Sequence, residues 1–141
     1  MKTYSMKPAE ISRDWWLVDA STMPLGKLAV VIADKLMGKS KVTFTPHIDN
    51  GDYVVVINAK NLVVTGEKAT DKKYYRHSGF PGGLTELSLE EVREKDPALI
   101  IEAAVKGMLP KNKLSADRLS RLKIFSGAEH AHTAQSPKEI K

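Results

Sequence analysis

The residues best suited to chemistry in this chain are cations concentrated in one short segment. Residues 106–123 hold six lysines and arginines and one acid, Asp117, so the segment carries a net charge of +5. That value equals the net charge of the whole chain, because the other 123 residues balance 16 cations against 16 acids. Cations placed along a phosphate backbone release counterions on binding, so this placement predicts a surface that binds nucleic acid. The six cations are Lys106, Lys111, Lys113, Arg118, Arg121 and Lys123.

The alternative for such a segment is a solvated helix face, which accounts for most runs of charge. The scarcity of acids argues against it, because solvated faces usually alternate both signs. Arg118 differs from the other cations, since on a helical wheel it lies among Leu114, Leu119 and Leu122. We therefore expect its side chain either to extend its charged end into solvent or to pair with an anionic group.

A second cationic segment, residues 68–77, combines charge with aromatic rings. Its cations adjoin Tyr74 and Tyr75, so phosphate contacts could be combined with stacking on exposed bases. Residues 78–83 follow with three glycines and a proline, which permit close approach of a backbone or a phosphate. The alternatives are a surface loop whose tyrosines pack on the core and a nucleotide phosphate loop. The phosphate loop is poorly supported, because neither GxGxxG nor GxxxxGK followed by Ser or Thr is present.

The histidines offer a different chemistry. His130 and His132 lie two residues apart beside Glu129, while His47 and His77 lie elsewhere. Two imidazoles and a carboxylate can bind a metal, but no further ligands are defined, so we expect no metal site. Imidazoles also donate to phosphates and stack on bases, which makes both C-terminal histidines candidate RNA contacts.

An enzymatic alternative stays open from the residues alone. It is a small α/β phosphotransfer or hydrolytic enzyme that uses His130, His132 or His77. A serine–histidine–acid site has no support from a GxSxG nucleophile elbow. A cysteine nucleophile is excluded because the chain contains no cysteine. Residues 43–47 form one more polar stretch that could act as a contact loop.

Composition restricts the classes of protein. With 141 residues and 42% hydrophobic content, the chain is long enough for one domain with a core. No apolar run approaches the roughly 20 residues of a membrane-spanning helix, and the N-terminus lacks the apolar stretch of a secretory signal. We therefore expect no membrane partner, and the absence of cysteine agrees with a reducing cytoplasm.

Hydrophobic patterning predicts the elements that position these residues. Tyr53–Ile57 is an uninterrupted β-branched run, typical of a strand that is buried on both faces in a parallel sheet. Leu25–Met37 is apolar over most of its helical circumference, which predicts a helix on a sheet that ends at Gly38. Further strands are predicted at 15–19, 62–65 and about 123–125, and further helices at 96–109 and 115–122. Residues 58–61 form either a tight turn or one turn of helix.

Strands that alternate with helices predict one α/β domain with a small, mainly parallel sheet. The domain spans residues 1–141, with an N-terminal extension at 1–14 and a polar C-terminal tail at 127–141. The tail either wraps the surface or becomes ordered on binding.

Four phrases in order carry a resemblance to a known family. They are TPHIDNGDYVVVINAKNLVVTG (45–66), KKYYRHSGFPGG (72–83), VKGMLPKNKL (105–114) and LKIFSGAEHAHTAQSP (122–137). Together they resemble the bacterial large-subunit ribosomal protein L13 family, and the resemblance runs from about Trp15 to Pro137. Their combination is highly specific, whereas any one phrase alone is less so.

The resemblance implies a three-layer α/β/α fold and a structural, non-enzymatic role in the cytoplasmic ribosome. The expected partners are large-subunit ribosomal RNA and neighbouring large-subunit ribosomal proteins, with no cofactor, metal or small-molecule substrate. The resemblance also implies a part early in subunit assembly. Members of the family have been associated with messenger-RNA binding and translational repression. A regulatory RNA-binding module that acts away from the ribosome is a further alternative.

Carried over by position, the resemblance and the charge pattern together predict the RNA contacts. The lysines would act as mobile point charges for phosphates, the arginines as forked donors, and the glycines as points of close backbone approach. The predicted contacts are Lys72, Lys73, Tyr75, Arg76, His77, Gly79, Gly82, Gly83, Lys106, Lys111, Lys113, Arg118, Arg121, Lys123, His130 and His132.

Overall fold

The computed structural model describes residues 2–140, and its centre is a small parallel sheet. The sheet has four strands in the order β5-β2-β1-β6, and every neighbouring pair runs parallel. The strands are β1 (Trp15–Asp19), β2 (Tyr53–Ile57), β5 (Leu122–Ile124) and β6 (Lys138–Glu139). The first two match their predicted bounds, and β5 lies one residue earlier than predicted. Met1 and Lys141, the ends of the expected domain, lie outside the described residues.

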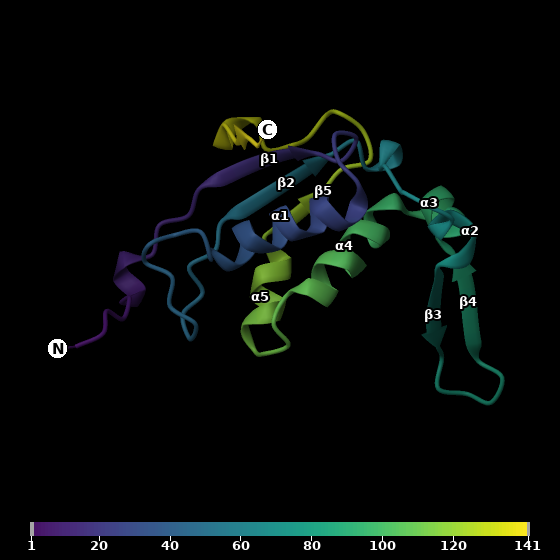
Figure 1. Ribbon diagram of the computed structural model, residues 1–141, viewed down its shortest axis with the longest axis horizontal. Helices are drawn as coiled ribbons and strands as arrows, with labels where there is room; N and C mark the ends of the chain where they lie inside the picture. The colour runs from purple at the N-terminus through teal and green to yellow at the C-terminus, as the bar shows by residue number, and fades with distance from the viewer. Residues whose placement is uncertain (1, 141) are drawn as a thin grey trace.

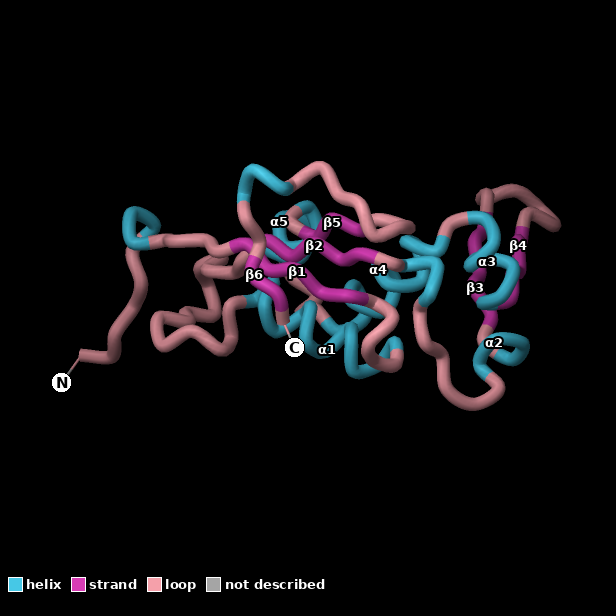
Figure 2. Tube along the Cα trace, turned by 90° about the horizontal axis from the view of Figure 1, so that it is seen from above, coloured by secondary structure: helices cyan, strands magenta, loops and turns pink. Residues whose placement is uncertain are grey.

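Helices α1, α4 and α5 cover one face of this sheet, as Figures 1 and 2 show. They are α1 (Leu25–Met37), α4 (Pro97–Met108) and α5 (Leu114–Ser120). α1 ends as predicted at Gly38, whose φ is 72° and whose Cβ, if it had one, would lie too close to the carbonyl group of Asn50. α4 begins after Asp96, whose side chain accepts a hydrogen bond from the Ala98 N–H at 3.1 Å. The helix predicted at 96–109 is therefore confirmed.

The C-terminal segment, residues 126–140, covers the opposite face of the sheet. Figure 2 shows this segment and its 3-10 helix η3 (Thr133–Gln135) across the sheet from α1, α4 and α5. Its last strand, β6, pairs with β1 at the edge of the sheet. The predicted α/β class with a small, mainly parallel sheet is thus confirmed. The layer opposite the helices is built mostly of irregular chain, because the polar tail wraps the surface.

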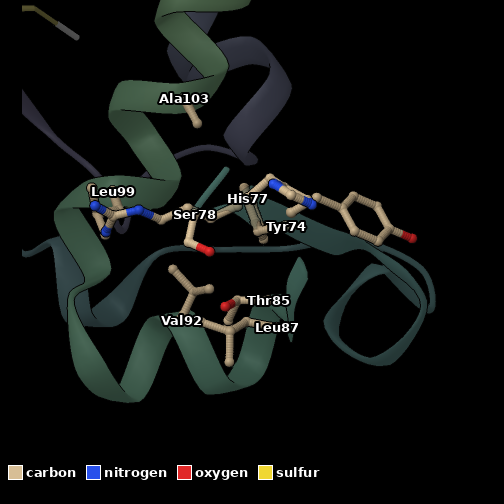
Figure 3. Close-up of a pocket in the computed structure, with 10 residues that line it drawn as sticks. Tyr74, His77, Ser78, Thr85, Leu87, Val92, Leu99 and Ala103 are labelled. Carbon is tan, nitrogen blue, oxygen red and sulfur yellow. The ribbon is translucent and has the colours of Figure 1, made fainter. Parts of the chain in front are cut away.

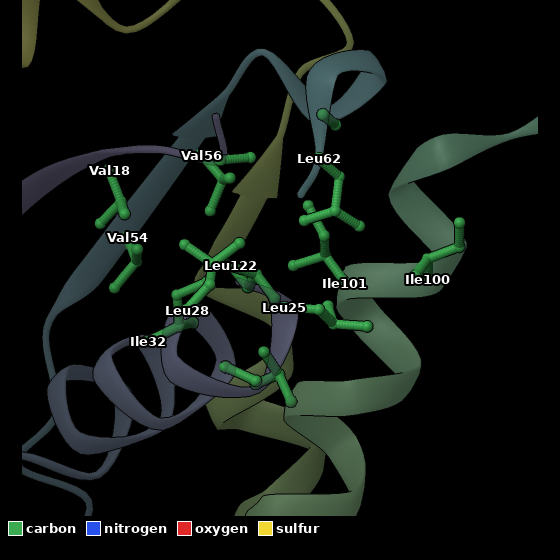
Figure 4. Packing of buried hydrophobic residues seen from close by; sticks show 14 of the residues in the cluster. Val18, Leu25, Leu28, Ile32, Val54, Val56, Leu62, Ile100, Ile101 and Leu122 are labelled. Atoms are coloured by element: carbon green, nitrogen blue, oxygen red, sulfur yellow. The ribbon is translucent and has the colours of Figure 1, made fainter. Parts of the chain in front are cut away.

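The core lies between the sheet and the helices. Val18, Val54 and Val56 belong to the same buried cluster as Leu28 and Ile32 of α1 (Figure 4). Burial of each such side chain contributes about 1.5–3 kcal/mol. Because strand residues alternate between faces, the intervening residue, Val55, points to the opposite face, and it is fully buried as well. The prediction that this strand is covered on both faces is confirmed.

A β-hairpin with two short helices projects from one end of this layered structure (Figure 1). The hairpin region comprises α2 (Lys68–Asp71), β3 (Lys73–His77), β4 (Leu84–Ser88) and α3 (Leu89–Lys95), with β3 and β4 antiparallel. α3 starts with a reciprocal cap, in which Ser88 Oγ accepts from the Glu91 N–H and the Glu91 carboxylate accepts from the Ser88 N–H. Hydrophobic patterning does not predict the hairpin, because exposed charges interrupt the alternation on both strands.

Residues 58–65 differ in part from the prediction. The strand expected at 62–65 does not form, and Val63 makes only an isolated bridge to Pro24. Leu62 is buried in the core, so this apolar run packs against the core instead of extending the sheet. Before it, Ala59–Asn61 forms the 3-10 helix η2, which favours the helical alternative for 58–61.

Candidate nucleic-acid interface

The cations between α4 and α5 are exposed on a short, ordered loop. Asn112 shapes this loop, and its side chain accepts a hydrogen bond from the Leu114 N–H at 3.1 Å. Lys111 and Lys113 flank Asn112 and are exposed, as is Lys106 in the last turn of α4. Within residues 2–140 none of these three lysines forms an ion pair. Their charges are therefore available to an external anion.

The two arginines of the same segment lie inside the protein. Arg118 is 2% exposed and Arg121 is 5% exposed, and both approach the carboxylate of Asp49. Leu119 and Leu122 pack at the core beside them, which draws this side of α5 inward. Of the two expectations for Arg118, the anionic partner is the one observed. The prediction that both arginines contact RNA is corrected here, because neither side chain reaches the surface.

Arg121 joins three separate parts of the chain. Its Nη2 donates to the Leu36 carbonyl oxygen at 2.9 Å and to Asp49 Oδ1 at 2.6 Å, while its Nε donates to the Asp52 carbonyl oxygen at 3.3 Å. Its Nη1 pairs with the second carboxylate oxygen of Asp49. Gly51 permits this approach, because a Cβ there would lie 2.7 Å from Nη2 of Arg121 and overlap the Leu36 carbonyl group. Forked, charge-assisted bonds of this kind hold the start of β2 against the end of α1.

Asp49 is surrounded by three arginines, and we call Arg13, Asp49, Arg118 and Arg121 the Asp49 cluster. Arg13 Nη1 and Arg118 Nε lie 3.9 Å and 3.8 Å from Asp49 Oδ1. Burial alone would raise the pKa of the Asp49 carboxyl, but the hydrogen bonds and charge of Arg121, the Gly51 N–H and the charge of Arg13 hold that pKa below its ordinary value. Arg118 differs from Arg121, because its Nε is buried with no hydrogen-bond partner in the described residues.

The hairpin presents a second group of cations. Strand alternation divides its side chains between two faces, so Tyr74 packs against the core whereas Tyr75 is 63% exposed. The packing alternative thus holds for one tyrosine and the exposed alternative for the other. The Lys73 Nζ lies 3.7 Å from Oε1 of Glu86, which is a long pair between exposed side chains. The exposed predicted contacts on this element are Lys72, Lys73, Tyr75, Arg76 and His77.

The tip of the hairpin, residues 78–83, is a compact turn. The Ser78 N–H donates to the Gly83 carbonyl oxygen at 3.1 Å, and a Cβ on Gly83 would overlap the Ser78 side chain. Around Gly79 and Gly82 the space is open, so these two positions leave room for a phosphate or a backbone to approach. Phe80 is 73% exposed between them. The sequence reasoning missed this ring, although its place between a glycine and a proline was a visible signal of an exposed turn.

The C-terminal histidines lie on the opposite face of the sheet. The rings of His130 and His132 are 6.3 Å and 5.7 Å from the Phe125 ring, and His132 is 5.1 Å from the Trp15 ring, centroid to centroid. Trp15 stacks in turn on Tyr53 at 4.3 Å with an interplanar angle of 4°. The two histidines therefore hold the C-terminal segment against the sheet.

The structure divides the predicted contacts between two sides of the molecule. In Figure 1 the tip of the hairpin and the α4–α5 loop both project below the sheet, on the side of the helices. Lys123 of β5 is opposite Val55 in the register, so its side chain points to the face that carries His130 and His132. The exposed lysines and the hairpin thus share one side, and these three residues lie on the other.

The polar stretch at 43–47 is partly built into the fold. Thr45 is buried, and its Oγ1 accepts a hydrogen bond from the Met6 N–H at 3.2 Å. The Thr43 hydroxyl accepts a hydrogen bond from the Asn50 side chain at 2.8 Å. His47 alone remains exposed in this stretch, so the segment acts mainly as a support for the N-terminal extension.

Two searches of the described residues bear on the alternatives. Residues 2–140 contain no group of three or more histidine, aspartate or glutamate side chains arranged to hold a metal ion. None of the helices described is long and apolar enough to cross a membrane.

Comparison with known proteins gives a consistent result over the length of the chain. The family model described as Ribosomal protein L13 matches residues 13–131. Proteins named Large ribosomal subunit protein uL13 from Ectopseudomonas mendocina and Pseudomonas aeruginosa are each 55% identical over 141 residues, which is 100% of this chain and 99% of each relative. One of the same name from Alcanivorax borkumensis is 54% identical over 140 residues, or 99% of both chains.

Proposed function

The chain belongs to the ribosomal protein L13 family, and from that premise we propose that it is a structural component of the large ribosomal subunit that binds large-subunit ribosomal RNA. Membership in this family also sets aside the enzymatic alternative, because the family consists of structural components of the ribosome. On this proposal the protein works in the cytoplasmic ribosome, beside neighbouring large-subunit proteins.

The observation that carries the RNA-binding part is the position of the free cations. Lys106, Lys111 and Lys113 are exposed on the α4–α5 side, and the hairpin presents Lys72 and Arg76 on the same side of the molecule (Figure 1). Among the described residues none of these five takes part in an ion pair. Two projecting elements with unpaired cations can reach separate phosphates of one folded RNA.

The chemistry of the exposed residues suggests how they divide the work. Lysines on the α4–α5 loop supply point charges to phosphates, whereas the Arg76 guanidinium can also donate two parallel hydrogen bonds or stack on a base. Tyr75 and Phe80 offer exposed rings for stacking near Gly79 and Gly82, where a phosphate can approach closely.

The proposed interface therefore leaves Arg118 and Arg121 out and centres on the exposed residues. Lys123, His130 and His132 remain proposed as a separate contact on the opposite face. We propose that RNA binding happens early in subunit assembly, as the family resemblance implies. Binding to messenger RNA stays a prediction of that resemblance and would draw on the same unpaired cations.

The test is binding of the full chain to large-subunit ribosomal RNA across a salt series, with excess transfer RNA as competitor. The double variant Lys111→Ala/Lys113→Ala should bind more weakly and reduce the slope of log affinity against log salt by roughly 1.5 to 2, because two phosphate contacts are lost. The matched control is Lys27→Ala/Lys39→Ala, which removes the same charge from two other exposed positions. Its slope should stay near that of the wild type.

Two results would contradict the proposal. Binding of the wild type that falls to the level of the transfer-RNA competitor would leave only the general affinity of a basic protein. Equal losses in the two double variants would mean that net charge, and not the α4–α5 loop, sets the affinity. Co-sedimentation addresses the regulatory alternative, since a subunit component should stay with the large subunit after a high-salt wash and a loosely bound regulator should not.

A further inference from the structure

A cavity of about 780 Å³ lies between the hairpin and the helices that flank it. Figure 3 shows that its lining side chains come from the hairpin, from α3 and from α4. Thr85 and Leu87 line it from β4, Val92 from α3, and Leu99 and Ala103 from α4. This volume lies in the range of roughly 300–1,000 Å³ that is typical of small-molecule sites. The site is therefore large enough for a planar ring system.

The walls of the cavity are mostly apolar, and some of this apolar surface is open to solvent. Leu99 is 51% exposed although it sits on an otherwise well packed helix, and Ala103 beside it is exposed too. Tyr74 forms part of the wall, and its hydroxyl is buried without a hydrogen-bond partner in the described residues. A wall that combines exposed aliphatic groups with a donor in need of an acceptor calls for an occupant that is flat, apolar on its faces and polar at its edges.

The rim of the cavity adds charge of one sign. Arg76 and His77 line it, and no carboxylate is among the residues that do so. Lys72 stands next to the wall, with its Nζ 5.5 Å from the centre of the Tyr74 ring. The hydroxyl of Ser78 also lines the cavity. The occupant should therefore carry negative charge beside its apolar part.

We propose that this cavity receives one unstacked base of the bound RNA, with the phosphates on either side of that base held by Arg76 and Lys72. A nucleotide is the ligand that joins a flat ring with polar edges to a flanking anion. Extruded bases that pack against aromatic and aliphatic side chains are a common mode of sequence-specific RNA recognition. The inference rests on the proposed RNA-binding function and adds to it a defined site for one nucleotide.

An apolar segment of a neighbouring protein is the competing occupant. It would fill the aliphatic part of the cavity but would leave Arg76 and Lys72 without anionic partners, unless it were acidic as well. The charge of the rim therefore favours RNA, and the experiment is arranged so that a protein occupant gives a different result.

The experiment fills the cavity in the full-length protein with Ala103→Trp, a change at an exposed helix position. The matched control is Val30→Trp, which places the same ring on the exposed side of α1, where Val30 is 57% exposed. Thermal unfolding checks that both variants are folded. Binding is measured against a large-subunit ribosomal RNA transcript that carries 4-thiouridine, and crosslinked peptides are mapped after irradiation.

We expect Ala103→Trp to weaken binding roughly tenfold, a loss that corresponds to one base stack, while the salt slope stays at the wild-type value because no phosphate contact is removed. Wild type and Val30→Trp should crosslink within residues 74–78 or 99–103, and Ala103→Trp should not. Because the wild-type crosslink needs no variant, it decides the question even if Ala103→Trp does not fold.

The other outcomes overturn the inference in distinguishable ways. If the wild type binds the transcript specifically, but without crosslinks at the cavity and with equal affinity for both tryptophan variants, the base site is absent and the proposed function stands. If Ala103→Trp binds RNA normally but fails to enter large subunits, the occupant is a protein. If the wild type does not bind specifically, the proposed function falls and the base site falls with it.

Discussion

The cations of residues 106–123 fall into two environments, and the contrast shows how little a count of charge says about its use. Lys111 and Lys113 stand on an exposed loop with no ion-pair partner in residues 2–140, whereas Arg118 and Arg121, only a few residues later, are buried against Asp49. The difference comes from their neighbours. Leucines that follow the loop must reach the core, and the arginines on the same side of α5 go inward with them.

The buried side of this comparison carries a structural cost that the exposed side does not. A guanidinium removed from water must recover its lost hydration through hydrogen bonds and opposite charge. Arg121 does so with carboxylate and carbonyl acceptors, while exposed lysines keep their water and remain free to exchange it for phosphate. Substitutions on the two sides should therefore affect different measurements.

The largest expected effect is the loss of stability on Arg121→Met. This change removes the bonds to Asp49 and to two backbone carbonyls, and it leaves a buried carboxylate with weaker partners. We expect a loss of about 3 kcal/mol in the free energy of unfolding, measured by urea denaturation. Lys111→Met is the control and should change that free energy by no more than about 0.5 kcal/mol. Similar losses for both variants would remove the distinction between the two environments.

The next effect is the loss of stability in acid. The pKa of Asp49 is held below its ordinary value in the folded protein, so the folded state binds fewer protons there than the unfolded state. This contribution is present above the unfolded pKa of about 4 and is lost as the pH falls through the folded pKa. Asp49→Asn should lower stability at neutral pH, and its deficit relative to the wild type should shrink below about pH 4.

The acid effect should be smaller than the first, because Arg121→Met also removes bonds to carbonyl groups that do not titrate. Asp117→Asn, a substitution on the exposed side of α5, is the control and should keep the wild-type profile. Urea denaturation at a series of pH values measures all three proteins. A deficit for Asp49→Asn that stayed constant from neutral to acid pH would show that the carboxylate charge plays no part.

The parallel sheet and α1 are the parts that the sequence predicts well, because each follows from a local pattern. The apolar run of β2 and the helix that ends at Gly38 match within a residue. The hairpin could not be found this way, because its pairing joins residues through a turn and its outer face carries charge and exposed Leu84 together. The prediction at 62–65 failed because an apolar run can pack on a core without any strand partner.

The candidate site divides along the same line. Charge placement and the family resemblance point to the α4–α5 loop and the hairpin, and the structure exposes both. The Asp49 cluster escaped prediction, because Asp49 and Arg121 are 72 residues apart and nothing local links them. One warning was present in the sequence, since Arg118 lies among leucines on the helical wheel. The cavity beneath the hairpin needed the three-dimensional arrangement of α3, α4 and β4.

A smaller effect is expected on the opposite face, at His132. Its ring packs near Trp15 and Phe125, and contacts of this kind contribute roughly 0.5–1.5 kcal/mol. His132→Ala should therefore lower the free energy of unfolding by about 1 kcal/mol and loosen the C-terminal segment, as seen in faster hydrogen exchange of the Ile140 amide, which donates to the Leu17 carbonyl at 2.9 Å. Unchanged exchange would mean that β6 is held without the histidine.

The smallest effect, and the one that sharpens the comparison most, is expected inside the Asp49 cluster itself. Arg118 is as buried as Arg121 but donates no hydrogen bond among the described residues, and its Nε lies 3.8 Å from Asp49. A buried charge with so little compensation is often replaced by an apolar side chain without loss. Arg118→Met should therefore change the free energy of unfolding by less than about 1 kcal/mol in either direction.

The same variant decides between two roles for Arg118. If it is only a weakly paired member of the cluster, Arg118→Met should keep the wild-type affinity and salt slope for large-subunit ribosomal RNA. A fall in the salt slope by about one, with stability unchanged, would mean that Arg118 leaves the interior to reach a phosphate when RNA binds. Burial in the free protein would then no longer separate structural arginines from binding ones, and the contrast with Lys111 and Lys113 would be one of timing and not of place.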